Sequence, residues 1–476
     1  MSLTKIKNAL PLIVVGALCC LLPVADAGDL ADTRAQPIVA LESVGVVDVV
    51  RGEVVGPRTV LIVAGVIAAI DSPEKVTIPP DALRVDGAGR YLIPGLVDMH
   101  VHLFNNASHR PPNEWAFPLF VAHGITGVRE MRSEPAQLAL VNRWRSKVET
   151  GELIAPRVLA AGVAVGAGPI DDTRRKVREA KTAGADFIKI FSEVPEANWR
   201  AILAEAGALH LPVCGHIPAE VSLLEAARAG QRSNEHLTQV YEACSARENE
   251  LLGARKGREG GEIVRLRDAQ EPEVLESYDQ VLCDRTAAAL AQTGQVQVPT
   301  LVLPYSEAHG SRKNFRDDPL WRYLRVDEQA RWQRIFQSDP VGDGKLADRR
   351  WEVSRQIVKT FQAAGVRILA GTDTPMPLVY PGFALHEELA LLVRAGLSPA
   401  EALRAATIGP AEFLGLSQSS GTVAVGKRAD LVLLDANPLL DIGNTKRIRA
   451  VVLSGRMLPR ADLDQLLDAA AKSQLP

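Results

Sequence analysis

The sequence has almost no excess charge of either sign. It contains 54 lysine and arginine residues against 57 aspartate and glutamate residues, for a formal net charge of -3. Such a balance gives no reason to expect a nucleic-acid partner, because nucleic acids are held by strongly basic surfaces. The composition, 47% hydrophobic and 23% charged, is that of an ordinary globular protein. With 476 residues the chain is too long for one small core, so two domains are expected.

The apolar segment near the N-terminus is short for a membrane-spanning helix. It covers residues 9–22, follows Lys5 and Lys7, and precedes the small-x-small tripeptide at residues 25–27. This order is typical of a secretory signal peptide, so we expect residues 1–27 to be removed by cleavage after Ala27. The mature protein would then be exported, periplasmic or secreted, with no membrane attachment. A retained membrane anchor is the alternative.

Cysteine is scarce, with five residues in the chain, two of them inside the predicted signal peptide. The other three, Cys214, Cys244 and Cys283, allow at most one disulfide in an oxidising compartment. Cys244 lies just before a long charged segment, and Cys283 lies within it. Cys214 stands two residues before His216, on the same face of a predicted strand. We therefore predict a disulfide between Cys244 and Cys283, with three free buried thiols as the alternative.

From residue 92 onward, short apolar runs alternate with longer helical patterns. Strand and helix alternating eight times are typical of a closed (β/α)8 TIM barrel, to which we assign residues 92–416. The predicted strands span residues 92–100, 126–130, 157–162, 187–190, 213–216, 232–235, 296–302 and 366–371, and the predicted helices include 173–182, 196–209 and 221–229.

The segments on either side of the barrel are rich in strand patterns. Residues 28–91 combine Val and Ile with turn signals at Gly, Pro and Asp. The strand pattern returns within residues 417–476, at 431–434 and 449–453. The predicted fold class is therefore α/β, with a TIM barrel and a small composite β-sandwich formed by the N- and C-terminal segments.

One part of the predicted barrel, residues 247–348, is long and highly charged. It holds a single strand candidate and is otherwise typical of helices and loops. An insertion between late barrel strands would lie over the mouth of the barrel. A solvated helical decoration is an equally weighted alternative.

Two histidines, His100 and His102, end the first predicted barrel strand at a spacing of i, i+2. Side chains two apart lie on the same face of a strand, so the two imidazoles are a candidate pair of metal ligands. A half-buried strand that carries histidines is the simpler interpretation. The carboxyl ends of barrel strands form the active-site face, and more residues of ligand type stand there. They are Lys189, His216, His236 and Asp373.

Lys189 is the unusual member of this set, because an ordinary lysine is cationic at neutral pH and would repel a metal ion. It lies near the end of an otherwise apolar strand. One interpretation is a buried lysine paired with Asp373 or Glu130. The other is a lysine converted by carbon dioxide to an anionic carbamate, which can bridge two metals.

These residues and their neighbours resemble the metal-dependent amidohydrolase superfamily, and most closely its imidazolonepropionase-like and prolidase-like branch. The resemblance covers nearly the whole mature chain. It rests on His100-x-His102, Lys189, His216, Asn234-Glu235-His236 and Ala370-Gly371-Thr372-Asp373, on Pro94-Gly95-Leu96-Val97-Asp98 before them, and on Gly421-Thr422-Val423 near the end of the fold.

The resemblance implies a centre with two divalent metal ions, expected to be Zn²⁺. A carbamate on Lys189 and a hydroxide would bridge the ions, which together polarise a carbonyl and lower the pKa of bound water. Carried over position by position, the resemblance assigns His100, His102 and Asp373 to the first ion and His216 and His236 to the second.

Two aspartates receive further roles. The resemblance implies that Asp373 takes the proton of the hydroxide and passes it to the leaving amine, as general base and then general acid. Asp98 precedes His100 by two residues on the same strand face, one layer deeper, where it could orient a ligand. A buried, hydrogen-bonded carboxylate of the barrel interior is the alternative for Asp98.

The substrate is not carried over from the relatives. The loop at residues 161–169 lacks the histidine usual in dipeptidase-like relatives, and residues 191–195 replace their glycine-rich turn. The implied reaction is therefore cleavage of a C–N amide bond in a small molecule, such as a dipeptide, an N-acyl amino acid or a cyclic amide. Whether the protein forms a homo-oligomer is left open.

Two other functions are weighed. A mononuclear deaminase of the same superfamily would carry His-x-x-Glu at the fifth strand, but Glu220 follows His216 by four residues. A non-catalytic metal-binding protein would be expected to lose ligands, and all six are present. The remaining histidines are expected to be structural or to lie in mouth loops. The structural ones are His123, His210 and His386, and the loop ones are His109 and His309.

Overall fold

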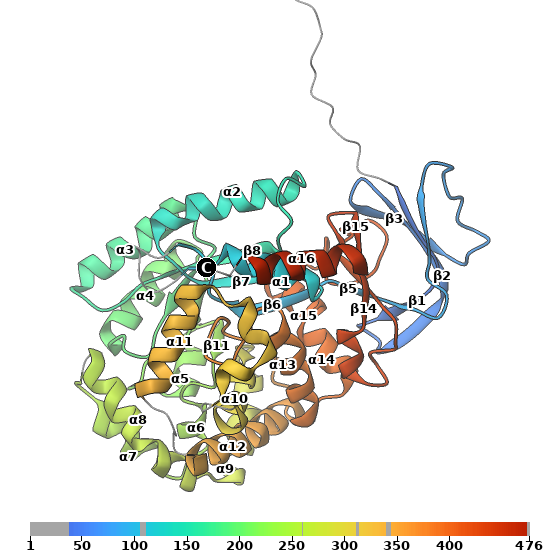
Figure 1. Ribbon diagram of the computed structural model, residues 1–476. Helices are drawn as coiled ribbons and strands as arrows, with labels where there is room; N and C mark the ends of the chain where they lie inside the picture. Colours follow the sequence, from blue (N-terminus) through green and yellow to red (C-terminus); the bar gives the residue numbers. More distant parts are fainter. Residues whose placement is uncertain (1–37, 105–110, 259, 311–313, 339–343, 474–476) are drawn as a thin grey trace, which may run out of the picture. The chain divides into compact units, whose positions relative to one another are not determined.

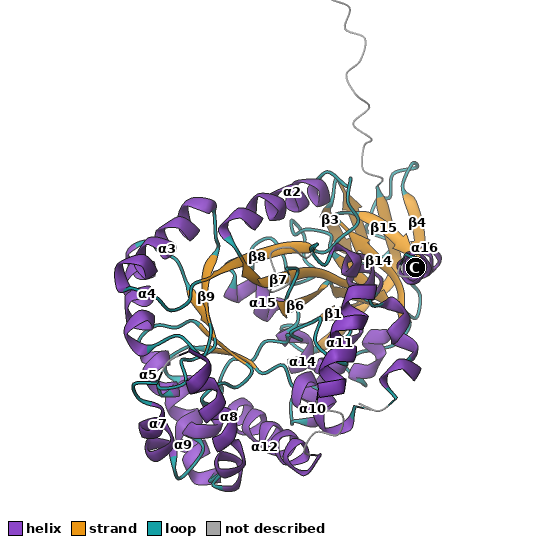
Figure 2. Ribbon diagram, turned by 60° about the vertical axis from the view of Figure 1, so that its left-hand side comes forward, coloured by secondary structure: helices purple, strands orange, loops and turns teal. Residues whose placement is uncertain are grey.

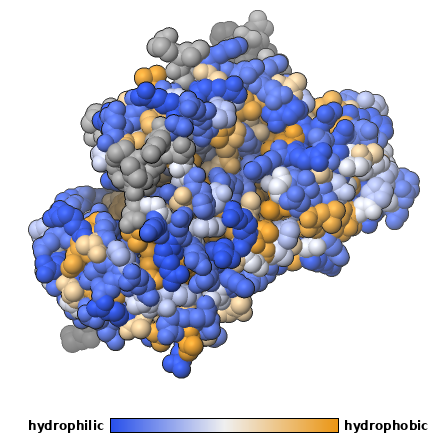
Figure 3. Space-filling view, turned by 60° about the horizontal axis from the view of Figure 1, so that its bottom comes forward, coloured by the Kyte–Doolittle hydropathy of each residue, from blue (hydrophilic) through white to orange (hydrophobic). Residues whose placement is uncertain are grey.

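The computed structural model of the protein describes residues 38–104, 111–258, 260–310, 314–338 and 344–473. The predicted signal peptide and His109 lie outside these residues. Among the helices that are described, none has the length and apolar character needed to cross a membrane. Figure 3 shows a face covered largely by hydrophilic residues, with apolar residues gathered in small patches.

Seven parallel strands, each hydrogen-bonded to the next along the chain, form most of a barrel. Figure 2 shows strands β6 to β9 curving round with helices on their outer side. This arrangement confirms the predicted TIM barrel. The strands are β6 (Leu96–Val101), β7 (Ile125–Ser133), β8 (Arg157–Ala164), β9 (Phe187–Ile190), β10 (Val213–Gly215), β11 (Ser233–Glu235) and β12 (Val296–Val298).

The barrel is closed by an irregular segment where the sequence predicts a regular eighth strand at residues 366–371. Single bridges pair Ile368 with Gln297 of β12 and Thr374 with Val101 of β6. The prediction of a regular strand is wrong, because only these single bridges form and the N–H of Ala370 donates to the carbonyl of Ala405 instead of to a neighbouring strand. The predicted strand at 296–302 is also too long, since a helix begins at Val302.

Helices cover the outside of the barrel and alternate with its strands (Figure 1). Between β6 and β11 they are α1 (Phe117–Ala122), α2 (Leu138–Glu149), α3 (Ile170–Ala183), α4 (Glu196–Ala208) and α5 (Leu223–Arg228). Ser398 caps α14 with its hydroxyl, and Pro399 occupies the first helical position, as predicted. The last helices are α13 (Phe383–Arg394), α14 (Pro399–Ala405), α15 (Ile408–Phe413) and α16 (Arg460–Lys472).

The N- and C-terminal segments form one eight-stranded sheet with its own apolar core. Its central strand β5 pairs in parallel with β1 and antiparallel with β13, so the predicted composite domain is confirmed. The strands are β1 (Val39–Asp48), β2 (Glu53–Val63), β3 (Val66–Asp71), β4 (Leu83–Asp86), β5 (Tyr91–Pro94), β13 (Leu431–Leu434), β14 (Ile448–Leu453) and β15 (Arg456–Pro459).

The single strand predicted at residues 92–100 is divided between the two sheets at Gly95. β5 lies in the composite sheet and β6 in the barrel, so that prediction is wrong. A Cβ atom at Gly95 would lie 2.0 Å from Thr126 Oγ1, so only glycine fits where the backbone crosses between the sheets.

The charged insertion is mostly helical. Cys244, directly after α6, is joined to Cys283 of α9 by a disulfide, so α7 and α8 lie within the closed loop. Cys214 is free and buried. The helices of this region are α6 (Val240–Ala243), α7 (Glu248–Arg255), α8 (Gly260–Glu276), α9 (Gln280–Ala291), α10 (Val302–His309), α11 (Val326–Ser338) and α12 (Gly344–Ala363).

Candidate metal centre

Three side chains of ligand type meet at the carboxyl end of β6. Oδ1 of Asp373 lies 3.1 Å from Nε2 of His100 and 2.8 Å from Nε2 of His102. One ligand atom from each residue lies within 4.8 Å of the other two. All three side chains are thus placed so that a single cation could contact them together.

The backbone around Asp373 fixes this arrangement. Its N–H donates to the carbonyl of His100 at 2.7 Å, which locks the closing segment against β6. A Cβ atom at Gly371 would lie 3.0 Å from Cβ of His100, so the absence of a side chain allows this close approach. The short closing segment therefore depends on glycine to place its aspartate.

Asp98 hydrogen-bonds both to β6 and to the closing segment that carries Asp373. Its carboxylate accepts hydrogen bonds from the backbone N–H of His100 and of Thr372, both at 3.1 Å, and from the Thr372 hydroxyl at 2.7 Å. Burial raises the pKa of Asp98 to about 7, against these hydrogen bonds, which lower it. Asp98 is thus a buried, hydrogen-bonded carboxylate. Its bonds fix the backbone of the two segments that carry candidate ligands, and they do not orient an imidazole ring.

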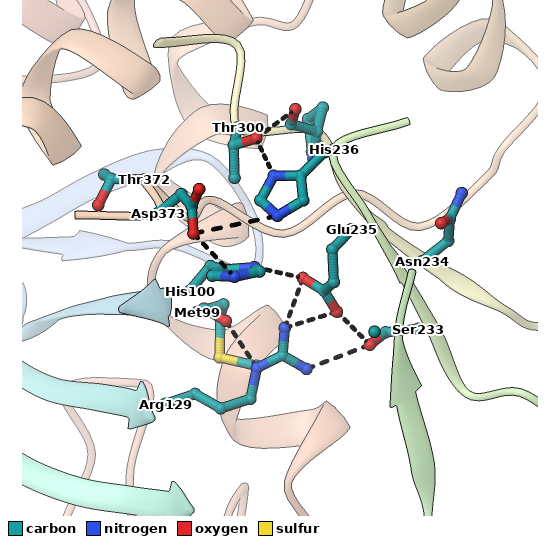
Figure 4. Close-up of polar contacts among 12 residues, drawn as sticks. Met99, His100, Arg129, Ser233, Asn234, Glu235, His236, Thr300, Thr372 and Asp373 are labelled. Atoms are coloured by element: carbon teal, nitrogen blue, oxygen red, sulfur yellow. Dashed lines mark hydrogen bonds and ion pairs between the residues drawn. The ribbon is translucent and has the colours of Figure 1, made fainter. Parts of the chain in front are cut away.

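His236 follows β11 and turns its ring toward Asp373. The ring centroid lies 4.4 Å from that of His100, and Nε2 lies 4.0 Å from Oδ1 of Asp373. Thr300 donates its hydroxyl to the carbonyl of Pro299 and therefore accepts from Nδ1–H of His236, at 2.7 Å. Nε2 of His236 is then the unprotonated nitrogen, and it faces the centre (Figure 4).

His216 follows β10 beside His236, with ring centroids 5.0 Å apart. Its Nδ1 lies 3.2 Å from the Ser192 hydroxyl. Burial lowers the pKa of His236 to about 3 and holds the pKa of His216 well below its usual value. Both rings are therefore neutral at pH 7, which is the form that binds metals.

Lys189 lies near the carboxyl end of β9. Its Nζ is fully buried and has no hydrogen-bond partner among the described residues, so it pairs with neither Asp373 nor Glu130. Burial lowers the pKa of Lys189 to about 8. A Cβ atom at Gly215 would lie 2.8 Å from Cδ of Lys189, so the glycine before His216 leaves room for the lysine stem.

Glu235, a residue to which the sequence gives no role, holds His100 in place. Its Oε2 lies 3.0 Å from Nδ1 of His100, and Arg129 donates to both carboxylate oxygens at 2.9 Å (Figure 4). Burial opposes ionisation of Glu235, but Arg129, His100 and Lys189 together outweigh it and lower the pKa. The signal that could have found Glu235 is its position beside His236 in the Asn234-Glu235-His236 motif.

This anchor determines the tautomer of the neutral His100 ring. When that ring donates from Nδ1 to the Glu235 carboxylate, Nε2 carries the lone pair and points at the Asp373 carboxylate. Burial raises the pKa of Asp373, but the attraction of His236 and His100 and the hydrogen bonds from His100 and His102 together hold that pKa well below its usual range. In the neutral tautomer two acceptors face each other across 3.1 Å, an arrangement that a cation between them would stabilise.

The other histidines lie away from the centre. His123 ends α1 and bonds to the carbonyl of Leu119, and His386 bonds to Thr445 and to the carbonyl of His123. His210 lies in the exposed turn after α4, with a positive φ of 54°. His309 is the last residue of α10, where its ring packs against Tyr305.

A cavity of about 310 Å³ opens beside the centre. His216, His236 and the two hydroxyl residues that hold them, Ser192 and Thr300, form part of its lining. The helices α6, α8, α10 and α12 complete the wall. The charged insertion therefore lies at the mouth of the barrel and shapes this cavity.

Comparison with known proteins identifies relatives along most of the chain. An amidohydrolase family profile matches residues 321–458. Dihydroorotase from Anaeromyxobacter dehalogenans (strain 2CP-1 / ATCC BAA-258) is 27% identical over 430 residues, which cover 84% of this chain and 88% of that protein. The solved structure of bottromycin amidohydrolase has a TM-score of 0.71 and 26% identity, covering 93% of this chain and 92% of that one. Together, the family profile, the dihydroorotase and the solved amidohydrolase support the amidohydrolase superfamily.

Two further comparisons are with proteins named imidazolonepropionase and prolidase. Imidazolonepropionase from Sphingopyxis alaskensis is 26% identical over 410 residues, covering 79% of this chain and 87% of that protein. A solved prolidase complexed with N-methylphosphonate-L-proline has a TM-score of 0.61 at 23% identity, covering 89% of this chain and 100% of that one, which shows a shared fold.

The side chains of the candidate centre fit divalent metal ions. The donor set combines neutral imidazoles with an ionised carboxylate, which suits zinc and similar ions. The unprotonated Nε2 of His100 and the buried Nζ of Lys189 both lack hydrogen-bond partners among the described residues. A cation at this position would satisfy the facing acceptors His100 and Asp373.

Proposed function

We propose that this protein is an exported amidohydrolase with two divalent metal ions that cleaves a C–N amide bond in a small molecule. The substrate would be a dipeptide, an N-acyl amino acid or a cyclic amide. The observation that carries the proposal is the meeting of His100, His102 and Asp373 around one point, with His236 beside them. The relatives named dihydroorotase and amidohydrolase support the C–N bond as the target.

The residues that would hold the two ions divide into two groups joined by Lys189. A carbamate on Lys189 would supply an oxygen to each ion, and burial favours the neutral amine from which it forms. When bound, the ions polarise the amide carbonyl and lower the pKa of the attacking water. The first group is His100, His102 and Asp373, and the second is His216 and His236.

Asp373 would move the proton. Because its pKa is held well below its usual range, it is ionised at neutral pH and can accept the proton of the attacking water. The same carboxylate then delivers that proton to the leaving nitrogen. Asp98 and the backbone of His100 keep Asp373 at this position during both transfers.

Elemental analysis and a substrate screen test the proposal together. Protein expressed with excess metal should contain about two divalent ions per chain, as a binuclear centre requires. A screen of dipeptides, N-acyl amino acids and lactams should yield a free amine with one of these classes. One ion or none per chain would contradict the binuclear centre, and ammonia release from an aminated ring would favour the deaminase alternative.

Export is tested separately. Protein recovered from the periplasm or the medium should begin at Gly28, because cleavage is expected after Ala27. A membrane-bound product that retains residues 1–27 would contradict cleavage and support the retained anchor.

A further inference from the structure

The cavity beside the metal centre has a largely apolar wall. Ile217, Val274, Leu275, Leu303 and Pro304 line it, together with the ring of Tyr241. The hydroxyl of Tyr241 is engaged with Ser354 at 2.8 Å, so this residue presents mainly its ring. Such walls stabilise an aliphatic or aromatic portion of a ligand by removing it from water.

Charged residues of α8, α10 and α12 interrupt this apolar wall. Arg350 of α12 lies between Glu271 of α8 and Glu307 of α10, and all three line the cavity. Nε and Nη2 of Arg350 donate to Glu271, and Nη1 donates to Glu307. Two carboxylates against one guanidinium leave this trio with one unit of negative charge.

The other charges of the lining are compensated within the protein. Glu242 is paired with the buried Arg255 at 2.8 Å, and Asp268 is paired with Arg267, also at 2.8 Å. The negative charge of the Arg350 trio is therefore the uncompensated charge among the described residues that line the cavity.

The trio is unsuited to a carboxylate ligand. An arginine binds a carboxylate best through two parallel N–H groups. In Arg350 the Nε and Nη2 pair is taken by Glu271, and Nη1 is taken by Glu307. A ligand carboxylate would have to displace a glutamate and approach a site of the same charge.

From these contacts we infer that the substrate carries a basic group on an apolar stem, as in a lysine or arginine residue, and that this side chain occupies the cavity. The stem packs on the apolar wall while the ammonium or guanidinium meets Glu271 and Glu307. The amide bond to be cleaved then lies at the end of the cavity that His216 and His236 line. This inference rests on the proposed function of the same site.

Two matched metal-binding probes test the inference by titration calorimetry on the metal-loaded protein. L-lysine hydroxamate and L-norleucine hydroxamate share the group that binds the metal and differ by the ε-amino group. We expect the lysine compound to bind about five- to tenfold more tightly, the range of a partly exposed charge pair. Equal affinities, or tighter binding of L-glutamate hydroxamate, would overturn the inference and leave the proposed function standing. Failure of all three compounds to bind would overturn the metal centre and the inference with it.

Two variants test whether this cavity causes the preference for the lysine compound over the norleucine compound. Glu307→Gln removes the excess charge, and the Glu307 side chain is 40% exposed, so the fold should tolerate the change. We expect the lysine-to-norleucine affinity ratio to fall to about one in this variant. The matched control is Glu276→Gln, an exposed glutamate of α8 that does not line the cavity, and it should keep the wild-type ratio. An unchanged ratio in Glu307→Gln would overturn the assignment to this cavity.

Salt and turnover provide independent readouts. Raising NaCl from about 0.05 to about 0.5 M should reduce the affinity for the lysine compound more than for the norleucine compound, because salt screens the charge pair. Among dipeptides that place lysine, norleucine or glutamate on either side of the amide, kcat/KM should be highest for a lysine peptide. Turnover that is highest for a glutamate peptide would contradict the inference while confirming hydrolysis.

Discussion

Lys189 has surroundings that do not suit an ordinary lysine. Its Nζ is buried without a hydrogen-bond partner among the described residues, and burial lowers its pKa to about 8. A buried ammonium without a hydrogen-bond partner is costly even with Nζ 4.9 Å from the centroid of the Phe191 ring, whereas the neutral amine is the form that reacts with carbon dioxide. These observations favour the carbamate interpretation over a structural ion pair.

The first prediction concerns this lysine. Lys189→Ala should lose metal and activity, and short carboxylic acids added with metal should restore part of both, because they can replace the missing oxygens. Lys189→Arg should be inactive as well, since a guanidinium keeps its positive charge and cannot form a carbamate. Elemental analysis and an amide hydrolysis assay measure both effects. Full metal content in Lys189→Arg would instead indicate a structural lysine, and Lys181→Ala, an exposed change on α3, is the control.

Asp373 carries the second prediction, which separates proton transfer from metal binding. Asp373→Asn keeps the size of the side chain and removes its ability to accept a proton. We expect kcat to fall by about 10²–10⁴, the usual range for losing a general acid–base group. The comparison is made at matched metal content, so that loss of an ion is not mistaken for loss of the proton carrier. Near-normal turnover would show that Asp373 acts only as a ligand.

At the scale of elements, the disulfide between Cys244 and Cys283 encloses α7 and α8. α8 supplies Glu271 and the apolar residues Val274 and Leu275 to the cavity wall. The bridge therefore restrains the part of the insertion that shapes the cavity.

The third prediction follows from this bridge. The double variant Cys244→Ser/Cys283→Ser should lose about 2–4 kcal/mol of unfolding free energy, mostly because the unfolded chain gains freedom. Chemical denaturation measures the loss, with Cys214→Ser as a control that leaves the bridge intact. Mass spectrometry showing three free thiols in the oxidised protein would refute the bridge itself.

The sequence predicted the barrel elements correctly where the polarity of successive residues changes abruptly along the chain. β9 matches its predicted bounds, and the helix at Pro399 begins where its cap and proline indicate. Gly95 was not recognised as a junction, because an unbroken apolar run looks the same whether it serves one sheet or two. The irregular eighth segment was missed because its path depends on how closely Gly371 approaches His100.

The sequence predicted which residues of the candidate site stand at strand ends. It did not predict the hydrogen bonds and ion pairs that join them to other residues. The barrel fold brings His100, His102, His236 and Asp373 together because all follow strands at one face. The anchoring of His100 by Glu235 and Arg129 was missed, since no spacing in the sequence reveals which buried charges meet across a barrel. The cavity charges were missed for the same reason, because α8, α10 and α12 are distant in sequence.

At the scale of the whole molecule, His386 connects the barrel helices to the C-terminal segment. It lies on α13, bonds to Thr445 and to the carbonyl of His123 at 3.0 Å each, and is 1% exposed. Burial lowers the pKa of His386 to about 3. The folded protein therefore holds this ring neutral through the range where the unfolded chain becomes protonated.

The fourth prediction is a dependence of stability on pH. Because the folded pKa lies below the unfolded value near 6.5, the contribution of His386 is complete above that pH and is lost as pH falls toward about 3. Between about pH 7 and pH 5, the wild type should lose about 1–2 kcal/mol more unfolding free energy than His386→Gln. Denaturant titrations at both pH values measure this difference. His210→Gln, in an exposed turn, should behave as the wild type, and parallel pH slopes for all three proteins would contradict the prediction.

The central position of β5 between β1 and β13 governs the order in which the protein can be built. Strands β1 to β5 leave the ribosome first, and their partner β13 emerges only after the entire barrel has been synthesised. Until then the nascent chain exposes an open hydrogen-bonding edge at β5, which can pair with another chain. Synthesis that stops before residue 431 would leave that edge permanently open, so incomplete chains should aggregate rather than persist as working barrels.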